Sequence, residues 1–213
     1  MQLPRISQAA HFARPRLAGR DGAPQGGAIR IRTAQTPGPR EVKQQLLETM
    51  LDGANANKVR DLANARPDLM EAASPDQRAR MSKILLDRLF FGAGDRQAIL
   101  AILKPAHAVA ELPASVGAIK GHGRLGALFR QMGDLGEGLD LARLGLAGGI
   151  YHDLDLVGEM GTTGVKALVR VATDDHLEGL SREAKAGMIA TLQSGPQTDE
   201  VEVMIRRLRN HLN

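Results

Sequence analysis

Apolar residues recur at helical spacing along almost the whole chain after residue 40, and no segment alternates apolar and polar residues as a strand would. The last segment shows the pattern most clearly, with apolar residues about one turn apart at Val201, Met204, Ile205, Leu208 and Leu212. A helix with one apolar face gains most of its stability by packing that face against other elements. The sequence therefore predicts an all-α fold.

Start and stop signals divide this region into separate helices. Asp52-Gly53 ends a helix that begins near Glu41, since glycine readily adopts the left-handed conformation found after a helix C-terminus. Ser74-Pro75-Asp76-Gln77 is a capping box with proline at the first helical position, and it predicts a long helix that continues to Phe91. Further helices are expected to begin at Ser181 and Thr198, and about eight to ten helices are expected in all.

Three segments share one plan, which is a helix, a glycine turn and a second, capped helix. They lie near residues 39–66, 74–104 and 181–213, and residues 39–53 align with residues 181–195 without a gap. A helix pair of this kind cannot bury its apolar face alone, so copies stack. The sequence predicts a multi-helix bundle or a short irregular helical-repeat array in one domain, residues 39–213. Signals common to all helical proteins are the alternative explanation of the likeness.

Residues 1–38 are rich in Arg, Pro and Gly and are predicted to form a disordered leader. When the chain is divided after residue 40, the first part holds seven arginines and one aspartate, and its net charge is +6. The remainder holds 21 bases and 23 acids, so its net charge is −2. The basic character therefore belongs to the leader. Its candidate contacts with an anionic partner are Arg5, Arg14, Arg16, Arg20, Arg30 and Arg32.

Four interpretations of the leader compete. A mitochondrial transit peptide is Arg-rich and acid-poor, but Pro4 and Pro15 interrupt a helix and Ser7 is the only serine here. A Sec signal needs an apolar run of about seven or more residues, which the leader lacks. The remaining two are a leader for bacterial export by a non-Sec route and a tail that binds nucleic acid or an anionic membrane surface weakly. Because the composition is heavy in Ala, Arg, Leu and Gly, as GC-rich genomes give, we expect a bacterial protein, cytoplasmic or exported.

Composition excludes several classes of function. The absence of cysteine excludes disulfides, thiolate zinc sites, iron–sulfur clusters and thiol nucleophiles. One tyrosine, four phenylalanines and no tryptophan do not suffice for a base-stacking platform. No apolar run approaches the roughly 20 residues that a transmembrane helix needs.

Two acidic segments contain a histidine and are the candidate metal sites. The first holds His152, Asp153, Asp155 and Glu159, and the second holds Asp174, Asp175 and His176. Carboxylates with an imidazole suit a divalent cation. The competing interpretation is that these acids cap helix N-termini or form a solvated surface.

The basic loop with Lys120, His122 and Arg124 is a weak candidate for anion binding, because it lacks the P-loop pattern and a preceding strand. The chain contains no nucleophile elbow, no His-Glu-x-x-His and no dinucleotide fingerprint after a strand. No cofactor is expected, apart from the divalent cation that the acidic segments allow.

These observations favour a non-enzymatic helical module that binds another protein, in a secreted bacterial effector or a secretion accessory whose leader serves export or tethering. The first alternative is a metal-assisted hydrolase that uses His152, Asp153, Asp155 and His176. The second alternative is a weak binder of nucleic acid or anionic surfaces through the arginine-rich leader.

Overall fold

The computed structural model describes residues 37–105 and 109–212, and this part of the chain contains helices and no strand. The prediction of an all-α fold is confirmed. The helices number thirteen α-helices and one 3₁₀-helix in these ranges, more than the eight to ten expected, because the glycine-rich middle divides into short helices. Residues 1–36 of the predicted disordered leader, which comprises residues 1–38, lie outside the described residues.

The helices follow one another with short connections. They are α1 (Pro39–Leu51), α2 (Ala56–Ala65), α3 (Pro67–Ala72), α4 (Pro75–Leu86), α5 (Ala93–Leu103), α7 (Leu112–Gly121), α8 (Leu125–Met132), α9 (Glu137–Ala147), the 3₁₀-helix η1 (Ile150–His152), α10 (Leu154–Glu159), α11 (Gly161–Val171), α12 (Asp174–Gly179), α13 (Arg182–Ser194) and α14 (Asp199–Asn210).

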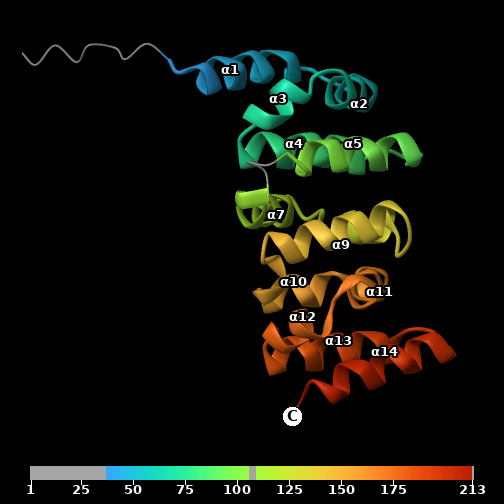
Figure 1. The fold of residues 1–213 in the computed structure, drawn as a ribbon. Helices are drawn as coiled ribbons and strands as arrows, with labels where there is room; N and C mark the ends of the chain where they lie inside the picture. The colour runs from blue at the N-terminus through green and yellow to red at the C-terminus, as the bar shows by residue number, and fades with distance from the viewer. Residues whose placement is uncertain (1–36, 106–108, 213) are drawn as a thin grey trace, which may run out of the picture. The chain divides into compact units, whose positions relative to one another are not determined.

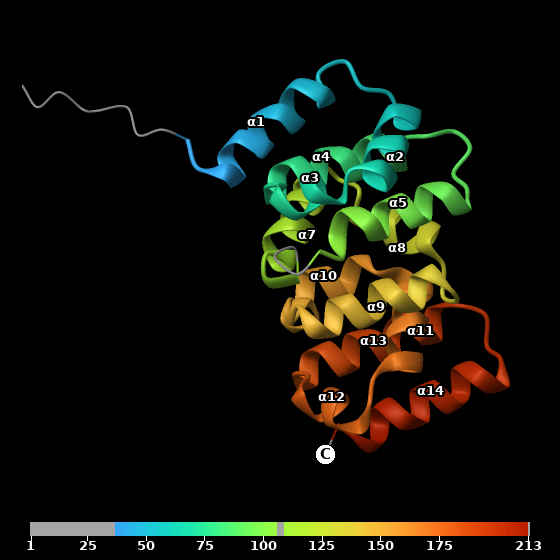
Figure 2. The same ribbon diagram turned by 45° about the horizontal axis from the view of Figure 1, so that its top comes forward.

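Within residues 37–213, the helices stack in layers in chain order (Figure 1). Helices α1 to α3 are followed by α4 and α5, then α7 to α9, then α10 and α11, and then α12 to α14 (Figures 1 and 2). Contacts between consecutive layers join α4 to α7, α9 to α11, and both α10 and α11 to α13. This arrangement is the short irregular helical-repeat array that the sequence predicts.

Side-chain caps begin the helices where the sequence places them. The Ser74 hydroxyl accepts a hydrogen bond from the Gln77 amide at 3.2 Å, and the Gln77 side chain accepts one from the Ser74 amide at 3.1 Å. At α13 and α14, the hydroxyl groups of Ser181 and Thr198 accept hydrogen bonds from the amides of Ala184 and Val201. Each cap satisfies an amide that has no partner within the helix, which stabilises the helix by about 1 kcal/mol.

One continuous apolar core runs from α1 to α14. Helix α14 buries Val201, Met204, Ile205 and Leu208 in it, as its sequence pattern predicts. Fully burying a side chain of this kind contributes roughly 1.5 to 3 kcal/mol, so each layer depends on the face of the next. No described helix is both long enough and apolar enough to cross a membrane.

Glycines in the middle of the chain allow elements to pack closely. A Cβ atom on Gly145 in α9 would lie 2.5 Å from the hydroxyl oxygen of the buried Tyr151. A Cβ on Gly164 in α11 would lie 3.0 Å from the Phe129 ring. By contrast, a Cβ on Gly117 in α7 would meet no atom within 4 Å. The glycines at 145 and 164 are therefore required by packing.

We predict opposite effects for two glycine substitutions within helices. Gly145→Ala forces Tyr151 out of its place and lowers the free energy of unfolding by about 1 to 3 kcal/mol. Gly117→Ala has free space and raises this free energy by about 0.5 to 1 kcal/mol, because it restricts the unfolded chain. Urea unfolding of both variants measures the two effects, and equal effects would contradict the assigned packing role.

A buried ion pair joins the first layers. The side chain of Arg78 in α4 is fully buried, and its Nη1 lies 2.7 Å from Oε2 of Glu111. The other carboxylate oxygen of Glu111 lies 2.7 Å from Nη2 of Arg40 in α1. Burial opposes ionisation of Glu111, but hydrogen bonds from Arg40 and Arg78 outweigh it and lower the pKa of Glu111. The carboxylate of Glu111 is therefore the counter-ion of the buried Arg78, and it also binds Arg40 of α1.

Glu111→Gln is expected to lower the free energy of unfolding by about 3 kcal/mol, because it leaves the buried charge of Arg78 without its counter-ion. Glu183→Gln is the matched control, since Glu183 is exposed on α13, and it is expected to change this free energy by about 0.5 kcal/mol or less. Chemical unfolding at neutral pH measures both, and a Glu111→Gln variant as stable as the control would overturn this account.

Candidate functional site

Four turns lie along one side of the stack (Figures 1 and 2). They connect α1 to α2, α4 to α5, α8 to α9 and α13 to α14, and comprise residues 52–55, 87–92, 133–136 and 195–198. We call this side the turn edge. Because each turn follows one helix of a stacked layer, the repeat brings segments far apart in sequence to one surface.

Ion pairs of arginines join neighbouring helices along the turn edge. Arg60 of α2 lies 3.9 Å from Asp95 of α5, and Arg96 of α5 lies 3.4 Å from Glu137 of α9. Arg170 of α11 then contacts both Asp134, in the α8–α9 turn, at 2.9 Å and Glu200 of α14 at 2.7 Å. These contacts join α2 to α5, α5 to α9, and α11 to α14.

Large apolar side chains project from two of these turns. Leu89 is 90% exposed and Phe90 is 81% exposed, both in the α4–α5 turn, and Leu135 in the α8–α9 turn is 64% exposed. We call Leu89 and Phe90 the apolar tip. An aromatic residue held in water beside a leucine is typical of a surface that another molecule covers.

Two carboxylates hold the base of the apolar tip. Asp87 receives hydrogen bonds from Lys83 and from Arg124. Asp95 is only 3% exposed, and it accepts hydrogen bonds from Arg88 at 2.7 Å and from the Gly92 amide at 3.0 Å. Each carboxylate thus fixes one end of the turn, so the tip is ordered before any partner binds.

The base of the tip carries a small excess of positive charge. Four cations, Lys83, Arg88, Arg124 and Arg60, face three carboxylates, Asp87, Asp95 and Asp61. Because Asp95 is buried beneath the guanidinium groups, its charge is not presented at the surface. The surface around Leu89 and Phe90 therefore presents more cations than carboxylates.

A pocket of about 340 Å³ lies between α7, η1 and α10. We call it the α7–α10 pocket. Its apolar wall consists of Pro113, Val116, Ile150 and Leu156, and its polar lining consists of Lys120, His152 and Asp153. This volume is at the lower end of the range of small-molecule sites and suffices for one or two side chains.

Carboxylates outnumber cations at the α7–α10 pocket. The Nζ atom of Lys120 lies 3.1 Å from Asp155. The hydrogen bond that Lys120 donates to Asp155 raises the pKa of Lys120 against partial desolvation, and the charges of Asp155, Asp153 and Glu159 raise it further. Three acids therefore act on one lysine. Leu154, which begins α10 among these acids, is an exposed large apolar residue.

Parts of the two predicted metal segments meet at a second, smaller pocket. His152 of η1 and Asp175 and His176 of α12 line this pocket of about 150 Å³. Asp153 lines the α7–α10 pocket, where Asp155 pairs with Lys120. Within the ranges that the structure describes, no three His, Asp or Glu side chains are grouped as metal ligands.

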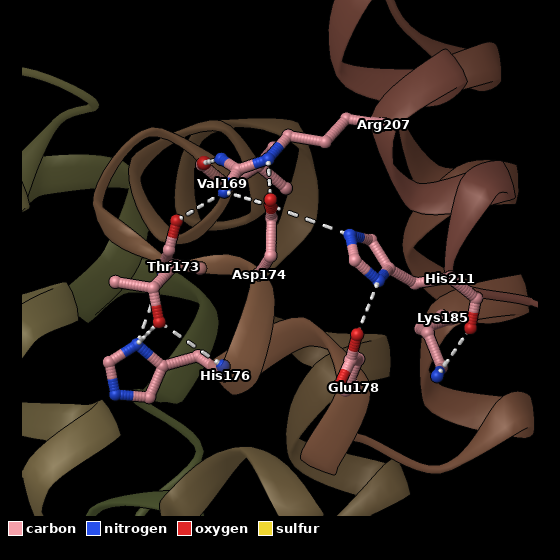
Figure 3. Close-up of polar contacts among 9 residues, drawn as sticks. Val169, Thr173, Asp174, His176, Glu178, Lys185, Arg207 and His211 are labelled. Carbon is pink, nitrogen blue, oxygen red and sulfur yellow. Dashed lines mark hydrogen bonds and ion pairs between the residues drawn. The ribbon is translucent and has the colours of Figure 1, made fainter.

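Members of these segments also act in helix capping and in contacts between helices, and Figure 3 shows the contacts of Asp174 and His176. The Asp153 side chain accepts hydrogen bonds from the amides of Asp155 and Leu156. The His176 ring contacts Thr173, the cap of α12. Asp174 lies 2.8 Å from Arg207 and 3.4 Å from His211.

The Asp174 contacts join α12 to the last helix. The hydrogen bond from Arg207 outweighs desolvation and lowers the pKa of Asp174, with a further contribution from the charge of Arg207 and from His211. Arg207 also donates to the carbonyl groups of Val169 and Ala172, and Lys185 donates to that of His211 (Figure 3). This network fastens α14 to α11, α12 and α13.

The three members of the predicted anion loop have different neighbours. Lys120 contacts Asp155, Arg124 contacts Asp87, and His122 lines a third pocket with Arg80 and Asp76. The six leader arginines from Arg5 to Arg32 lie outside the described residues.

The apolar tip was missed by sequence reasoning, which extends the fourth helix to Phe91. Helix α4 ends at Leu86, so Leu89 and Phe90 stand in the turn. The signal that identifies the tip is the run Leu89-Phe90-Phe91 directly before Gly92, because three consecutive residues of a helix cannot all face one core.

Comparison with known proteins adds no assignment, because no family model, no curated protein and no solved structure matches the chain.

The hydrogen bonds of Asp87, which we call the clamp on the tip, predict that the stability of the fold is sensitive to acid. Burial opposes ionisation of Asp87, but the hydrogen bonds from Lys83 and Arg124 outweigh it and lower the pKa of Asp87. A carboxylate with a lowered pKa stabilises the fold at pH values above its unfolded pKa of about 3.9, and this stabilisation is lost as the pH falls towards the folded value. Asp87→Asn is therefore less stable than the wild type at pH 7, and the difference shrinks below about pH 4.

Urea unfolding at several pH values between neutral and acid tests this expectation. Asp52→Asn is the control, since Asp52 makes no ion pair within the described residues. A stability difference for Asp87→Asn that stays constant with pH would count against the clamp.

Proposed function

We propose that this protein is a non-enzymatic interaction module that binds another protein chain through its turn edge, with the apolar tip as the anchor. The observation that carries the proposal is the exposure of Leu89 and Phe90 in a turn whose two ends are fixed by Asp87 and Asp95. Such residues do not stabilise the isolated chain, since their apolar surface stays in water.

The physical form of the tip supports an anchoring role. Interface energy is concentrated in a few large side chains that enter well-packed pockets. Ordering a flexible loop costs about 0.5 to 1.5 kcal/mol per immobilised side chain, and a turn held by hydrogen bonds avoids part of this cost. Leu135, in the α8–α9 turn on the same edge, is a further exposed apolar side chain.

Mixed charges along the edge favour a protein as the partner. Asp61, Glu137 and Glu200 alternate with arginines there, so a uniformly anionic surface would meet repulsion as well as attraction. The metal-assisted hydrolase finds less support, because its four residues do not share one pocket: His152 lines both pockets, whereas Asp153 lines only the first and His176 only the second. Export or tethering by the leader in a bacterial host remains part of the proposal and rests on composition.

Site-specific cross-linking tests the proposed anchor. The full chain carries a photo-reactive benzoyl-phenylalanine in place of Phe90, and a matched chain carries it in place of Val203, which is exposed on α14. Irradiation in cells is expected to give a defined protein adduct from position 90 and not from position 203. The adduct should disappear when Leu89→Ser is added. The same adducts from both positions, or none from position 90, would refute the proposal.

A further inference from the structure

We infer that the partner of the apolar tip is a second copy of this chain, whose α7–α10 pocket receives Leu89 and Phe90. This inference rests on the proposed function and names the partner. Two independent features carry it, since the described residues include both an exposed apolar projection and a pocket of about 340 Å³ with an apolar wall.

The pocket suits the tip in volume and in the apolar character of its wall. The wall of the pocket is formed by Val116, Ile150 and Leu156, and the exposed Leu154 extends the apolar surface beside it. When a leucine and a phenylalanine enter this pocket, the apolar surfaces of both the tip and the pocket are removed from water. Burial of an aromatic side chain alone removes about 150 to 250 Å² of surface from water.

The charges are complementary as well. At the pocket, Asp153, Asp155 and Glu159 surround a single lysine, so this surface has an excess of two negative charges. At the base of the tip, four cations face three carboxylates, of which Asp95 is buried. Opposed excess charges steer the two surfaces together and disfavour contact between two tips or two pockets.

The position of the surfaces determines the kind of assembly. The α4–α5 turn lies on the turn edge, whereas α7 and α10 lie on the opposite side of the stack (Figures 1 and 2). One copy can therefore use its tip and its pocket at the same time. Such a contact is heterologous, and it builds a ring if the rotation closes or an open chain if it does not.

Two substitutions separate the halves of this contact. Leu89→Ser with Phe90→Ser removes the tip, and both residues are exposed, so the fold is retained. Gly117→Met blocks the pocket, because Gly117 lines it and a side chain there starts in open space. Val203→Ser on the exposed face of α14 is the control.

Sedimentation velocity of the full-length chains over a wide concentration range provides the measurement. The wild type and Val203→Ser are expected to self-associate, and each of the other two variants is expected to weaken association by about tenfold or more. A mixture of the tip variant and the pocket variant should form a one-to-one dimer and nothing larger, because one intact tip and one intact pocket remain.

Three results would overturn the inference. They are a wild type that stays monomeric at every concentration, association that neither variant weakens, and a mixture that forms no dimer. The failure of this inference is distinguishable from the failure of the proposed function. A cross-link from position 90 to a different protein, with a monomeric wild type, would keep the anchor and reject the second copy as partner. The absence of any adduct from position 90 would reject the proposed function itself.

Discussion

Burial of one helix face against the next layer is the interaction on which every part of this structure depends. The helices are short, and helices of this length are marginal in water unless their apolar faces pack. The core from Leu47 to Leu208 is continuous, so each layer is stabilised by its neighbours in the chain. Ion pairs fix the positions of the helices relative to one another within this packing. For example, Glu111 joins Arg40 of α1 to Arg78 of α4.

The same arrangement separates stability from function. Helix faces are used for packing between layers, whereas the turns lie outside the layers and can carry side chains that the core does not need. The α4–α5 turn carries Leu89 and Phe90, and its ends are held by the shared carboxylates Asp87 and Asp95. An array of helix pairs thereby presents a rigid apolar projection on one side and an acidic apolar pocket on the other.

Local signals explain why much of the fold follows from the sequence. The caps at Ser74, Ser181 and Thr198 and the apolar face of α14 depend on residues close in sequence, and they appear where predicted. The pockets join residues far apart in sequence, such as Val116 with Leu156 and His152 with His176, so no local pattern predicts them. The sequence alone predicts that Leu89 and Phe90 belong to a helix that packs on the core, because hydrophobicity does not indicate whether the helix ends before them.

Amide hydrogen exchange of the full chain at low and high protein concentration tests the central claim most directly. If the tip of one copy enters the pocket of another, exchange at residues 88–92 and at residues 149–156 slows together as the concentration rises. Exchange at residues 195–198, on the same edge but without a large apolar side chain, stays unchanged. Unchanged exchange in both segments, or slowing in only one of them, would contradict the account.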